Sequence, residues 1–362
     1  MPDEKIYDLI VIGGGINGAG IARDAAGRGL SVLLLEAGDL AQATSSGSTK
    51  LIHGGLRYLE YYEFALVRKA LKEREALMRI APHIIWPLDF VLPHAPHLRP
   101  RWMIRMGLFL YDLLGSRKTL PSSKPVNLLA HDWGKPIKGI MRMGFPMPIA
   151  GSRIRVLWFS RDGCARNKAD VKTRERVVRI RTVPDYAYWR VETQYGAQYH
   201  GRLVVNASGP WASALMRENG FDETEIPDLR LVKGSHIIVP KIYDGGQCYI
   251  LQNDDNRIVF AIPYEGDFTL IGTTDVDMGH DPDEPPVIME GEAAYLIDVI
   301  NDYFVTDLSV SNIISAYSAV RPLIEEAGKS AAAVTRDYRL HMAYKDNLPV
   351  LNVLGGKITT YR

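Results

Sequence analysis

The sequence predicts an α/β fold with two domains, on three observations. A glycine-rich turn between two apolar runs near the N-terminus is typical of a dinucleotide-binding βαβ unit. Short β-type runs between residues 230 and 275 indicate a separate antiparallel sheet. A length of 362 residues exceeds what one hydrophobic core usually covers. We therefore expect a dinucleotide-binding domain beside a second domain whose sheet presents a substrate.

The first apolar run, residues 8–12, predicts a buried strand, and the run at 31–35 predicts a second one. Between them Gly13, Gly15 and Gly18 stand in the spacing G-x-G-x-x-G. Gly13 permits a tight turn, Gly15 lets a pyrophosphate approach backbone N–H groups, and Gly18 lets helix and strand pack closely. This pattern predicts dinucleotide binding and leaves NAD and FAD both open.

The polar residues after the second strand suit the same ligand. Glu36 ends that strand and is placed to accept hydrogen bonds from a ribose. The loop at 39–56 is small and hydroxyl-rich, so it offers donors to a diphosphate. An ordinary polar loop is the alternative.

Composition excludes several classes of function. With a formal net charge of +1 and no basic tract with interleaved aromatics, we expect no nucleic-acid partner. The two cysteines, Cys164 and Cys248, lie far apart, so we expect no metal, no disulfide framework and a reducing compartment. No apolar run reaches about 18 residues and the N-terminus carries acids, so we expect neither a membrane-spanning helix nor a signal peptide. These features predict a cytoplasmic location.

The middle of the chain alternates helical and extended patterns. Residues 62–79 predict a helix, whereas five prolines within 82–100 predict a crossing between the domains. Residues 202–211 predict a strand that feeds a glycine turn, and 291–304 predict a helix. Residues 349–354 predict a further strand, and the Gly-Gly pair and hydroxyl residues after it are typical of a turn into a helix.

A basic amphipathic helix is predicted within residues 97–118. One helical face carries apolar residues, namely Trp102, Met106, Phe109, Leu110 and Leu113. The ends carry cations, namely Arg99, Arg101, Arg105, Arg117 and Lys118. Such a helix suits an anionic membrane surface, and a helix that buries this face in its own domain is the alternative.

Eight segments together resemble one family, the FAD-dependent respiratory glycerol-3-phosphate dehydrogenases. They are GGGINGAGIARDAAGRGL, ATSSGSTKLIHGGLRYLE, NASGPW, KGSHIIVP, IGTTDVD, AVRPL, TRDY and GGKITTYR. The resemblance implies FAD as cofactor and a two-domain FAD-binding flavoprotein fold. It also implies oxidation of sn-glycerol 3-phosphate at C2 to dihydroxyacetone phosphate, with electrons passed to membrane quinone. The expected location is then peripheral, at the inner face of the cytoplasmic membrane, and a homodimer is a further expectation.

The resemblance also implies how the chain divides and where it binds FAD. The FAD domain is expected at 1–80, 150–225 and 335–362, and the substrate domain at 81–149 and 226–334. The residues expected to contact FAD are Gly13, Gly15, Asn17, Gly18, Glu36, Thr44, Ser45, Ser46, Ser48, Lys50, Leu51, Val177, Ala207, Gly209, Gly356, Lys357, Thr359 and Thr360.

The matched motifs also supply candidates for the reaction itself. A phosphomonoester carries about −1.5 to −2 charges near neutral pH, so its pocket needs several cations. The expected substrate-binding cations are Arg57, Arg321, Arg336 and Lys357, and Arg321 is also a catalytic candidate. Oxidation of an alcohol also needs a general base, for which His236 and His53 are the candidates, and a structural histidine is the alternative for each.

Two departures from the family pattern lead to further expectations. Residues 144–173 do not follow the pattern, as in a shifted reading frame or a lineage-specific loop. Relatives continue past residue 362 with a helical C-terminal domain, which we expect to be absent here. Two other functions therefore remain open at this point: a glycerol-3-phosphate oxidase that produces peroxide, and a truncated flavin-binding remnant without catalysis.

Overall fold

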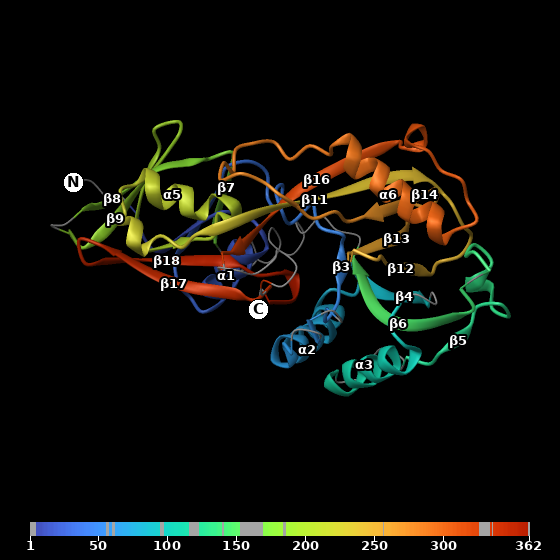
Figure 1. Cartoon of the computed structure of the whole chain (residues 1–362). Coiled ribbons are helices and arrows are strands. Elements are labelled where there is room, and N and C mark those ends of the chain that lie inside the picture. The colour runs from blue at the N-terminus through green and yellow to red at the C-terminus, as the bar shows by residue number, and fades with distance from the viewer. Residues whose placement is uncertain are drawn as a thin grey trace.

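The strands form two mixed sheets, one of eight strands and one of ten, within the described residues. The computed structural model describes residues 5–55, 58–59, 62–94, 98–115, 123–139, 141–152, 169–183, 186–255, 257–325, 334 and 336–360. Figure 1 shows the sheets at opposite ends of an elongated molecule. Two long strands, β11 (Leu229–Pro240) and β16 (Ser315–Ile324), extend from the second sheet toward the first. The predicted α/β fold is confirmed.

The first sheet has a parallel centre of apolar strands. Its order is β17-β18-β10-β1-β2-β7, and β9 and β8 extend it from β10. Side chains from both faces of the central strands are buried in separate clusters, which explains near-continuous apolar runs such as VLLLE. The strands are β1 (Ile6–Ile12), β2 (Val32–Glu36), β7 (Asp170–Thr173), β8 (Val177–Val183), β9 (Tyr188–Thr193), β10 (Gln198–Asn206), β17 (Tyr338–Lys345) and β18 (Leu348–Gly355).

The second sheet is mostly antiparallel, and its two faces pack against different helices. Its order is β15-β11-β14-β13-β12-β4-β6-β3, with β16 beside β11 and β5 beside β6. In β12, Tyr249 and Leu251 face the core of helix α6, while Cys248 and Ile250 face the core of α2 and α3, as the two-residue period of a strand requires. The other strands are β3 (Leu51–Ile52), β4 (Ile85–His94), β5 (Val126–Asn127), β6 (Met143–Ser152), β12 (Cys248–Gln252), β13 (Ile258–Tyr264), β14 (Phe268–Gly272) and β15 (Val276–Asp277).

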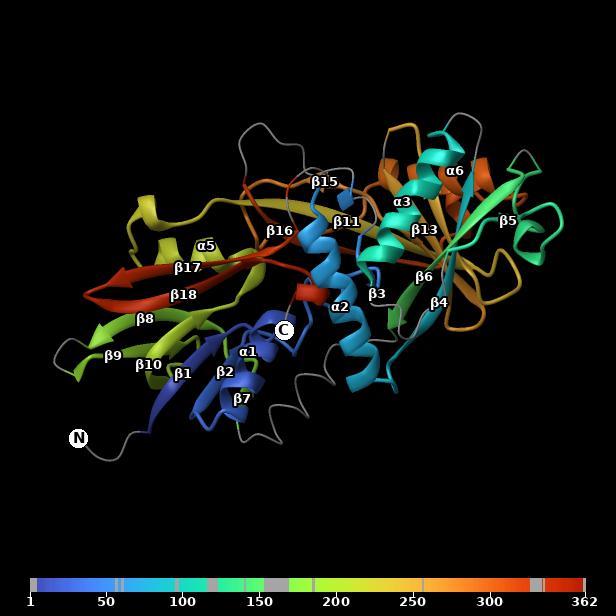
Figure 2. The same cartoon turned by 90° about the horizontal axis from the view of Figure 1, so that it is seen from below.

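The helices lie on the faces of these sheets. Figure 2 shows α2 and α3 together beside the second sheet, with the turn at 358–360 close to α2. The α-helices named here are α1 (Ile16–Gly27), α2 (Phe64–Ile80), α3 (Arg101–Leu114), α5 (Ala212–Glu218) and α6 (Glu290–Tyr303). Short 3-10 turns include η4 (Gly209–Trp211) and η7 (Ile358–Thr360). No helix in the described part of the chain is long and apolar enough to cross a membrane.

The segment with five prolines differs from its expectation. It contains β4, a ten-residue strand that pairs with β6 along its whole length, where a crossing between domains was predicted. Pairing with β12 involves only Phe90 and Val91 of this strand, so Pro87 and Pro93 lie where an N–H group toward β12 is not needed. The prolines therefore exclude a helix here without excluding a strand.

The domain ranges predicted from the sequence do not coincide fully with the two sheets. Strand β3, within the range 1–80 assigned to the first domain, pairs with β6 of the second sheet. The loop before β3 therefore leads from one sheet to the other. The domain ranges themselves stay a prediction.

Three parallel strands end at one edge of the first sheet. Ile12 of β1 is level with Asn206 of β10, which is level with Asn352 of β18. The Asn206 side chain donates a hydrogen bond to Asn352 Oδ1 at 2.8 Å. The glycine turn after β1 and the short turn after β10 therefore start side by side, and β18 continues beside them to Gly355, at the edge where open α/β sheets bind their ligands.

Candidate active site

The turn after β1 is built around close backbone contacts. Gly13 has φ +103°, and a Cβ there would lie 2.5 Å from the carbonyl oxygen of Ala207. A Cβ on Gly18 would lie 1.9 Å from the carbonyl oxygen of Gly13. The sequence predicted both roles, and the turn leads into α1 at Ile16. The N-terminus of α1 therefore faces the edge where the three strands end.

The Glu36 carboxylate holds this turn in place. It accepts hydrogen bonds from the backbone N–H groups of Gly14 at 2.6 Å and of Gly38 at 2.8 Å. The Ser45 hydroxyl accepts a hydrogen bond from the N–H of Ile16 at 3.1 Å, in the first turn of α1. A carboxylate and a hydroxyl thus lie beside the predicted dinucleotide turn, as a ribose and a diphosphate would need.

The hydroxyl-rich loop joins the two sheets. The Thr44 hydroxyl donates to the carbonyl oxygen of Val320 on β16 at 2.5 Å. A Cβ on Gly47 would lie 2.1 Å from the Cβ of Ala319, so the loop backbone packs directly against β16. Asn17 reaches the other side, where its amide donates to the carbonyl oxygen of Gly355 at 3.2 Å. The predicted FAD-contact segment 13–18 therefore contacts Gly355, directly before the predicted residues 356–360, and the predicted loop at 44–51 contacts β16.

His236 of β11 lies buried on the second sheet. Its Nε2 is 2.9 Å from the Thr49 hydroxyl, and its ring stacks on Tyr317 of β16 with a centroid distance of 4.8 Å. A Cβ on Gly272, the residue opposite on β14, would lie 2.2 Å from the ring, so only glycine leaves room for it. Burial lowers the pKa of His236 to about 3, and the charges of Arg321 and Lys50 add to this effect. The ring is therefore neutral near pH 7.

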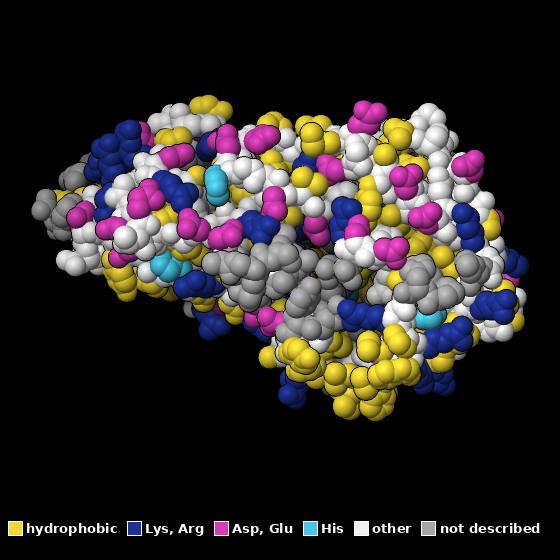
Figure 3. Space-filling model, in the orientation of Figure 1, with side chains coloured by type: hydrophobic (Ala, Val, Ile, Leu, Met, Phe, Trp, Pro, Cys, Tyr) yellow, Lys and Arg dark blue, Asp and Glu magenta, His cyan; other side chains and the backbone are white. Residues whose placement is uncertain are grey.

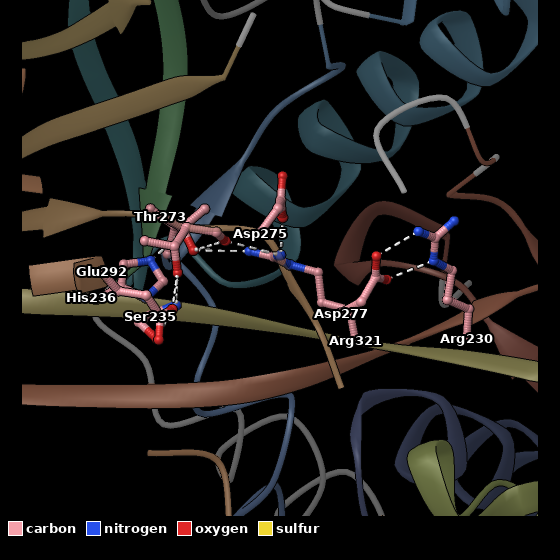
Figure 4. A network of polar contacts seen from close by, with 10 residues as sticks. Arg230, Ser235, His236, Thr273, Asp275, Asp277, Glu292 and Arg321 are labelled. Carbon is pink, nitrogen blue, oxygen red and sulfur yellow. Dashed lines mark hydrogen bonds and ion pairs between the residues drawn. The ribbon is translucent and has the colours of Figure 1, made fainter. Parts of the chain in front are cut away.

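Arg321 of β16 is held by the turn that follows β14. Its guanidinium donates to the carboxylate of Asp275, and its Nη2 donates to the Thr273 hydroxyl at 2.9 Å. Figure 4 shows these contacts beside His236. Arg321 therefore lies near one of the two predicted bases but already has a carboxylate partner.

A second group of predicted residues gathers at the end of β18. The Lys357 ammonium is buried, lies 4.4 Å from the centre of the Tyr58 ring, and has no hydrogen-bond partner among the described residues. Burial lowers its pKa to about 7; the Asp337 carboxylate opposes this shift, and Arg336 adds to it. Buried ammonium groups are usually paired, so an anionic ligand would suit this one. It fits both the flavin and a phosphate ester.

His53 lies in the same group. Burial lowers its pKa to about 3, with further lowering by the charges of Lys357 and Arg74. Its Nδ1 accepts a hydrogen bond from the N–H of Gly55 at 3.1 Å, so the neutral ring carries its proton on Nε2. Its ring packs edge-on against Phe260, which pairs with Gly272, the residue opposite His236. Phe260 therefore lies between the strand that carries His236 and the His53 ring.

Other predicted residues have different places in the structure. Arg57 lies outside the described residues. Val177 is buried in the core of the first sheet, and Leu51 in the core between the second sheet and α2. Ser48 donates to the carbonyl oxygen of Ser45, and Lys50 donates to that of Ser46, so these side chains shape their own loop.

The turn residues next to Arg321 were missed by the sequence analysis. Asp275 and Thr273 belong to the segment IGTTDVD, which carried part of the family resemblance but to which no role was assigned. Thr49, the partner of His236, was likewise not assigned. The available signal was an acid and two hydroxyls that follow an apolar strand of the second sheet.

Comparisons with known proteins agree with this geometry. The model of the family described as FAD dependent oxidoreductase matches residues 8–362. A glycerol-3-phosphate dehydrogenase of Pseudomonas aeruginosa is 49% identical over 100% of this chain and 70% of its own length. A D-erythritol 1-phosphate dehydrogenase of Brucella abortus is 47% identical over 100% of this chain and 72% of its own. Among solved structures, the glycerol-3-phosphate dehydrogenase of Bacillus halodurans complexed with FAD matches with a TM-score of 0.73 at 25% identity, over 99% of this chain and 62% of that one.

Proposed function

The chain belongs to the FAD dependent oxidoreductases, and from this premise we propose that it oxidises sn-glycerol 3-phosphate at C2 to dihydroxyacetone phosphate and passes the electrons to membrane quinone. FAD is its cofactor and, when bound, accepts the hydride that leaves C2. The residues that would hold FAD are those of the glycine turn, Glu36, the loop at 44–51 and the segment 355–360.

The single observation that carries this proposal is the buried Lys357 ammonium. The Asp337 carboxylate raises its pKa and the Arg336 charge lowers it, so two cations lie near one carboxylate, and the ammonium still has no hydrogen-bond partner among the described residues. A phosphate ester supplies negative charge and accepts several hydrogen bonds. We assign the phosphate to Lys357 and Arg336, and we keep the predicted Arg57 in the same role.

His236 is the better candidate for the general base. The C2 hydroxyl must lose its proton as the hydride leaves, and neutral His236 can accept it. The Thr49 hydroxyl, 2.9 Å from Nε2, lies on the route of that proton. An anionic substrate close to Arg321 offsets the positive field and raises the pKa of His236 toward the working range.

His53 is better suited to donate a hydrogen bond than to accept a proton. Because its Nδ1 already accepts the N–H of Gly55, the hydrogen on Nε2 is the free donor. Such a donor stabilises negative charge on a substrate oxygen. The sequence left the choice between the two histidines open, and this contact favours His236 as the base.

The outer face of α3 supports peripheral membrane attachment. Trp102, Met106, Phe109 and Leu113 have exposed fractions between 58% and 66% and lie on one stripe of the helix. Figure 3 shows an apolar patch with Lys and Arg beside it on the underside of the molecule, where Figure 1 places α2 and α3. A different stripe, which includes Ile104, Leu108 and Tyr111, packs on the second sheet. The exposure of this face, of which only Leu110 is half-buried, supports membrane attachment over the alternative that the helix buries the face within its own domain.

The same helix contacts the candidate site. The hydroxyl of Tyr111 accepts a hydrogen bond from the N–H of Gly54 at 2.9 Å, and Gly54 follows His53 directly. A membrane surface against the outer stripe of α3 would therefore lie close to the loop that carries a predicted catalytic residue. This arrangement favours quinone, which resides in the bilayer, as the electron acceptor.

The reaction can be tested by mixing the purified yellow protein anaerobically with sn-glycerol 3-phosphate. We expect bleaching of the flavin and recovery of the colour on addition of a soluble quinone. Bound flavin that the substrate never bleaches would contradict the proposal and favour a remnant without catalysis. Stoichiometric peroxide in air, with slow quinone reduction, would favour the oxidase.

D-Erythritol 1-phosphate is the second candidate substrate, because the relative of that name is nearly as similar as the first. Both compounds are polyol phosphate monoesters, so the same cations would bind them. The ratio of their kcat/KM values decides between them. Size-exclusion chromatography with light scattering tests the expected homodimer.

A further inference from the structure

The Asp275 carboxylate and its neighbours fix one end of the Arg321 guanidinium. Nη1 donates to Asp275 and, at 3.4 Å, to the carbonyl oxygen of Thr274, while Nη2 donates to the Thr273 hydroxyl. Within the described residues nothing accepts a hydrogen bond from Nε. Both terminal nitrogens are therefore bound to one three-residue turn, and the Nε side is left for a ligand.

The path of the Arg321 side chain over β11 depends on Gly234. A Cβ on Gly234 would lie 2.2 Å from Nη2, so any larger residue would push the guanidinium away. His236 lies two positions along β11 and points to the same face. The glycine thus lets Arg321 cross the strand next to the proposed base.

The turn itself is anchored in a buried network. The Thr274 hydroxyl donates to the Glu292 carboxylate of α6 at 2.6 Å, and Ser235 of β11 donates to the same oxygen at 2.8 Å. The Lys233 ammonium lies 2.8 Å from the other oxygen of Glu292, with both side chains less than a tenth exposed. Buried polar groups that are fully satisfied hold one geometry, so the Thr273–Asp275 turn is a rigid support.

We propose that Asp275 is a positioning residue of the reaction: it holds Arg321 so that the Nε side faces the C2 oxygen of the substrate. This inference rests on the proposed function. The Asp275 carboxylate also neutralises part of the Arg321 charge. Arg321 then acts on the reacting oxygen, and the phosphate goes to Lys357 and Arg336, since the Lys357 ammonium has no hydrogen-bond partner among the described residues.

A matched control lies two residues away. Asp277 of β15 pairs with Arg230 of β11 through two hydrogen bonds of 2.6 Å, on the same segment and between the same residue types. Figure 4 shows both pairs, with Asp277 and Arg230 directed away from His236. Substitution of Asp277 therefore removes a comparable ion pair without touching Arg321.

The experiment measures kcat and KM for glycerol 3-phosphate, flavin content and melting temperature. In D275A we expect kcat/KM to fall about 30-fold, mainly in kcat, with flavin content unchanged. D275N keeps an acceptor oxygen, so it should stay within about fivefold of the wild type. In an R321A background, D275A should have an effect below about threefold, because a positioning residue has nothing left to position. D277A should leave the kinetics unchanged.

Three results would overturn the inference. One is a D275A enzyme with the kinetics of D277A, and another is an equal loss from D275A with and without Arg321. The third is a combination: a lower melting temperature in D275N, together with normal kinetics in every variant that folds. That result would mean that the Asp275–Arg321 pair has a structural role only. If glycerol 3-phosphate does not reduce the flavin of the wild-type protein, the proposed function itself fails. The first three results contradict the role of Asp275 alone.

Discussion

The glycine turn of the first sheet and the substrate face of the second sheet are built in opposite ways. The turn and the Glu36 carboxylate that holds it come from one short run of chain, 13–38. The turn depends on the absence of side chains at close backbone contacts. The proposed substrate face collects His236, the 273–275 turn and Arg321 from three strands or their ends, and depends on a buried histidine beside an ion pair. We therefore expect that shape governs cofactor binding and that electrostatics governs the proposed reaction. The following changes test that division.

The largest effect is expected at Gly18. In G18A the new methyl carbon would lie 1.9 Å from the Gly13 carbonyl oxygen, and neither backbone can give way cheaply. We expect about 3 kcal/mol of destabilisation and loss of bound flavin, measured by denaturant unfolding and by the absorbance of the purified protein. The control is G107A on α3, where a Cβ meets nothing within 4 Å. A yellow, stable G18A protein would contradict the role given to shape.

The next effect separates the two histidines. H236Q should lower the rate of anaerobic flavin reduction about 1000-fold, because a general base is lost. H53Q should lower it only about tenfold, because one hydrogen-bond donor is lost. Stopped-flow absorbance measures both rates, with flavin content as the control. The reverse order of the two effects would make His53 the base.

A third test uses the low pKa of Lys357. With a pKa of about 7 the ammonium is protonated below that pH and mostly neutral above it, so anion binding at pH 8 must take up a proton. We expect the Kd of dihydroxyacetone phosphate to rise by up to about tenfold per pH unit above 7. Calorimetry at pH 8 in two buffers of different ionisation enthalpy measures the uptake.

The variant K357M should abolish both the proton uptake and this pH dependence. The control is K241M, which removes an exposed lysine paired with Asp244. Proton uptake that persists in K357M would assign the titration to another group and remove Lys357 from the anion site.

The last test concerns the membrane face. Charge reversal of Arg101 and Arg105 on α3 should weaken binding to anionic vesicles by roughly 10- to 30-fold, since each cation near such a surface is worth about 1 kcal/mol. Reversal of the exposed Arg179 and Arg181 on β8, at the other end of the molecule, is the control. Vesicle sedimentation measures both. Equal binding by both variants would argue against α3 as the attachment surface.

The two regions also differed in how well the sequence predicted them. The strands, the glycine turn and Glu36 follow from spacing within one βαβ unit, and the structure confirms their arrangement. The helix at 101–114 was predicted too, but it is apolar on two stripes, and its sequence does not say which stripe is buried. Asp275 and Thr49 had no assigned role, because their partners lie 46 and 187 positions away in the chain.

The sequence by itself determined the cofactor class and the order of most strands along the chain, and it predicted a set of cations suited to a phosphate ester. Those properties depend on residues that are neighbours in the chain or on composition. Only the tertiary structure decided that Arg321 has a carboxylate partner, that Lys357 does not hydrogen-bond to a described residue, and that His53 is turned toward donation. The physical reason is that burial and strand pairing set the charge, the pKa and the free hydrogen-bonding atoms of a side chain, and both arise from contacts between distant segments.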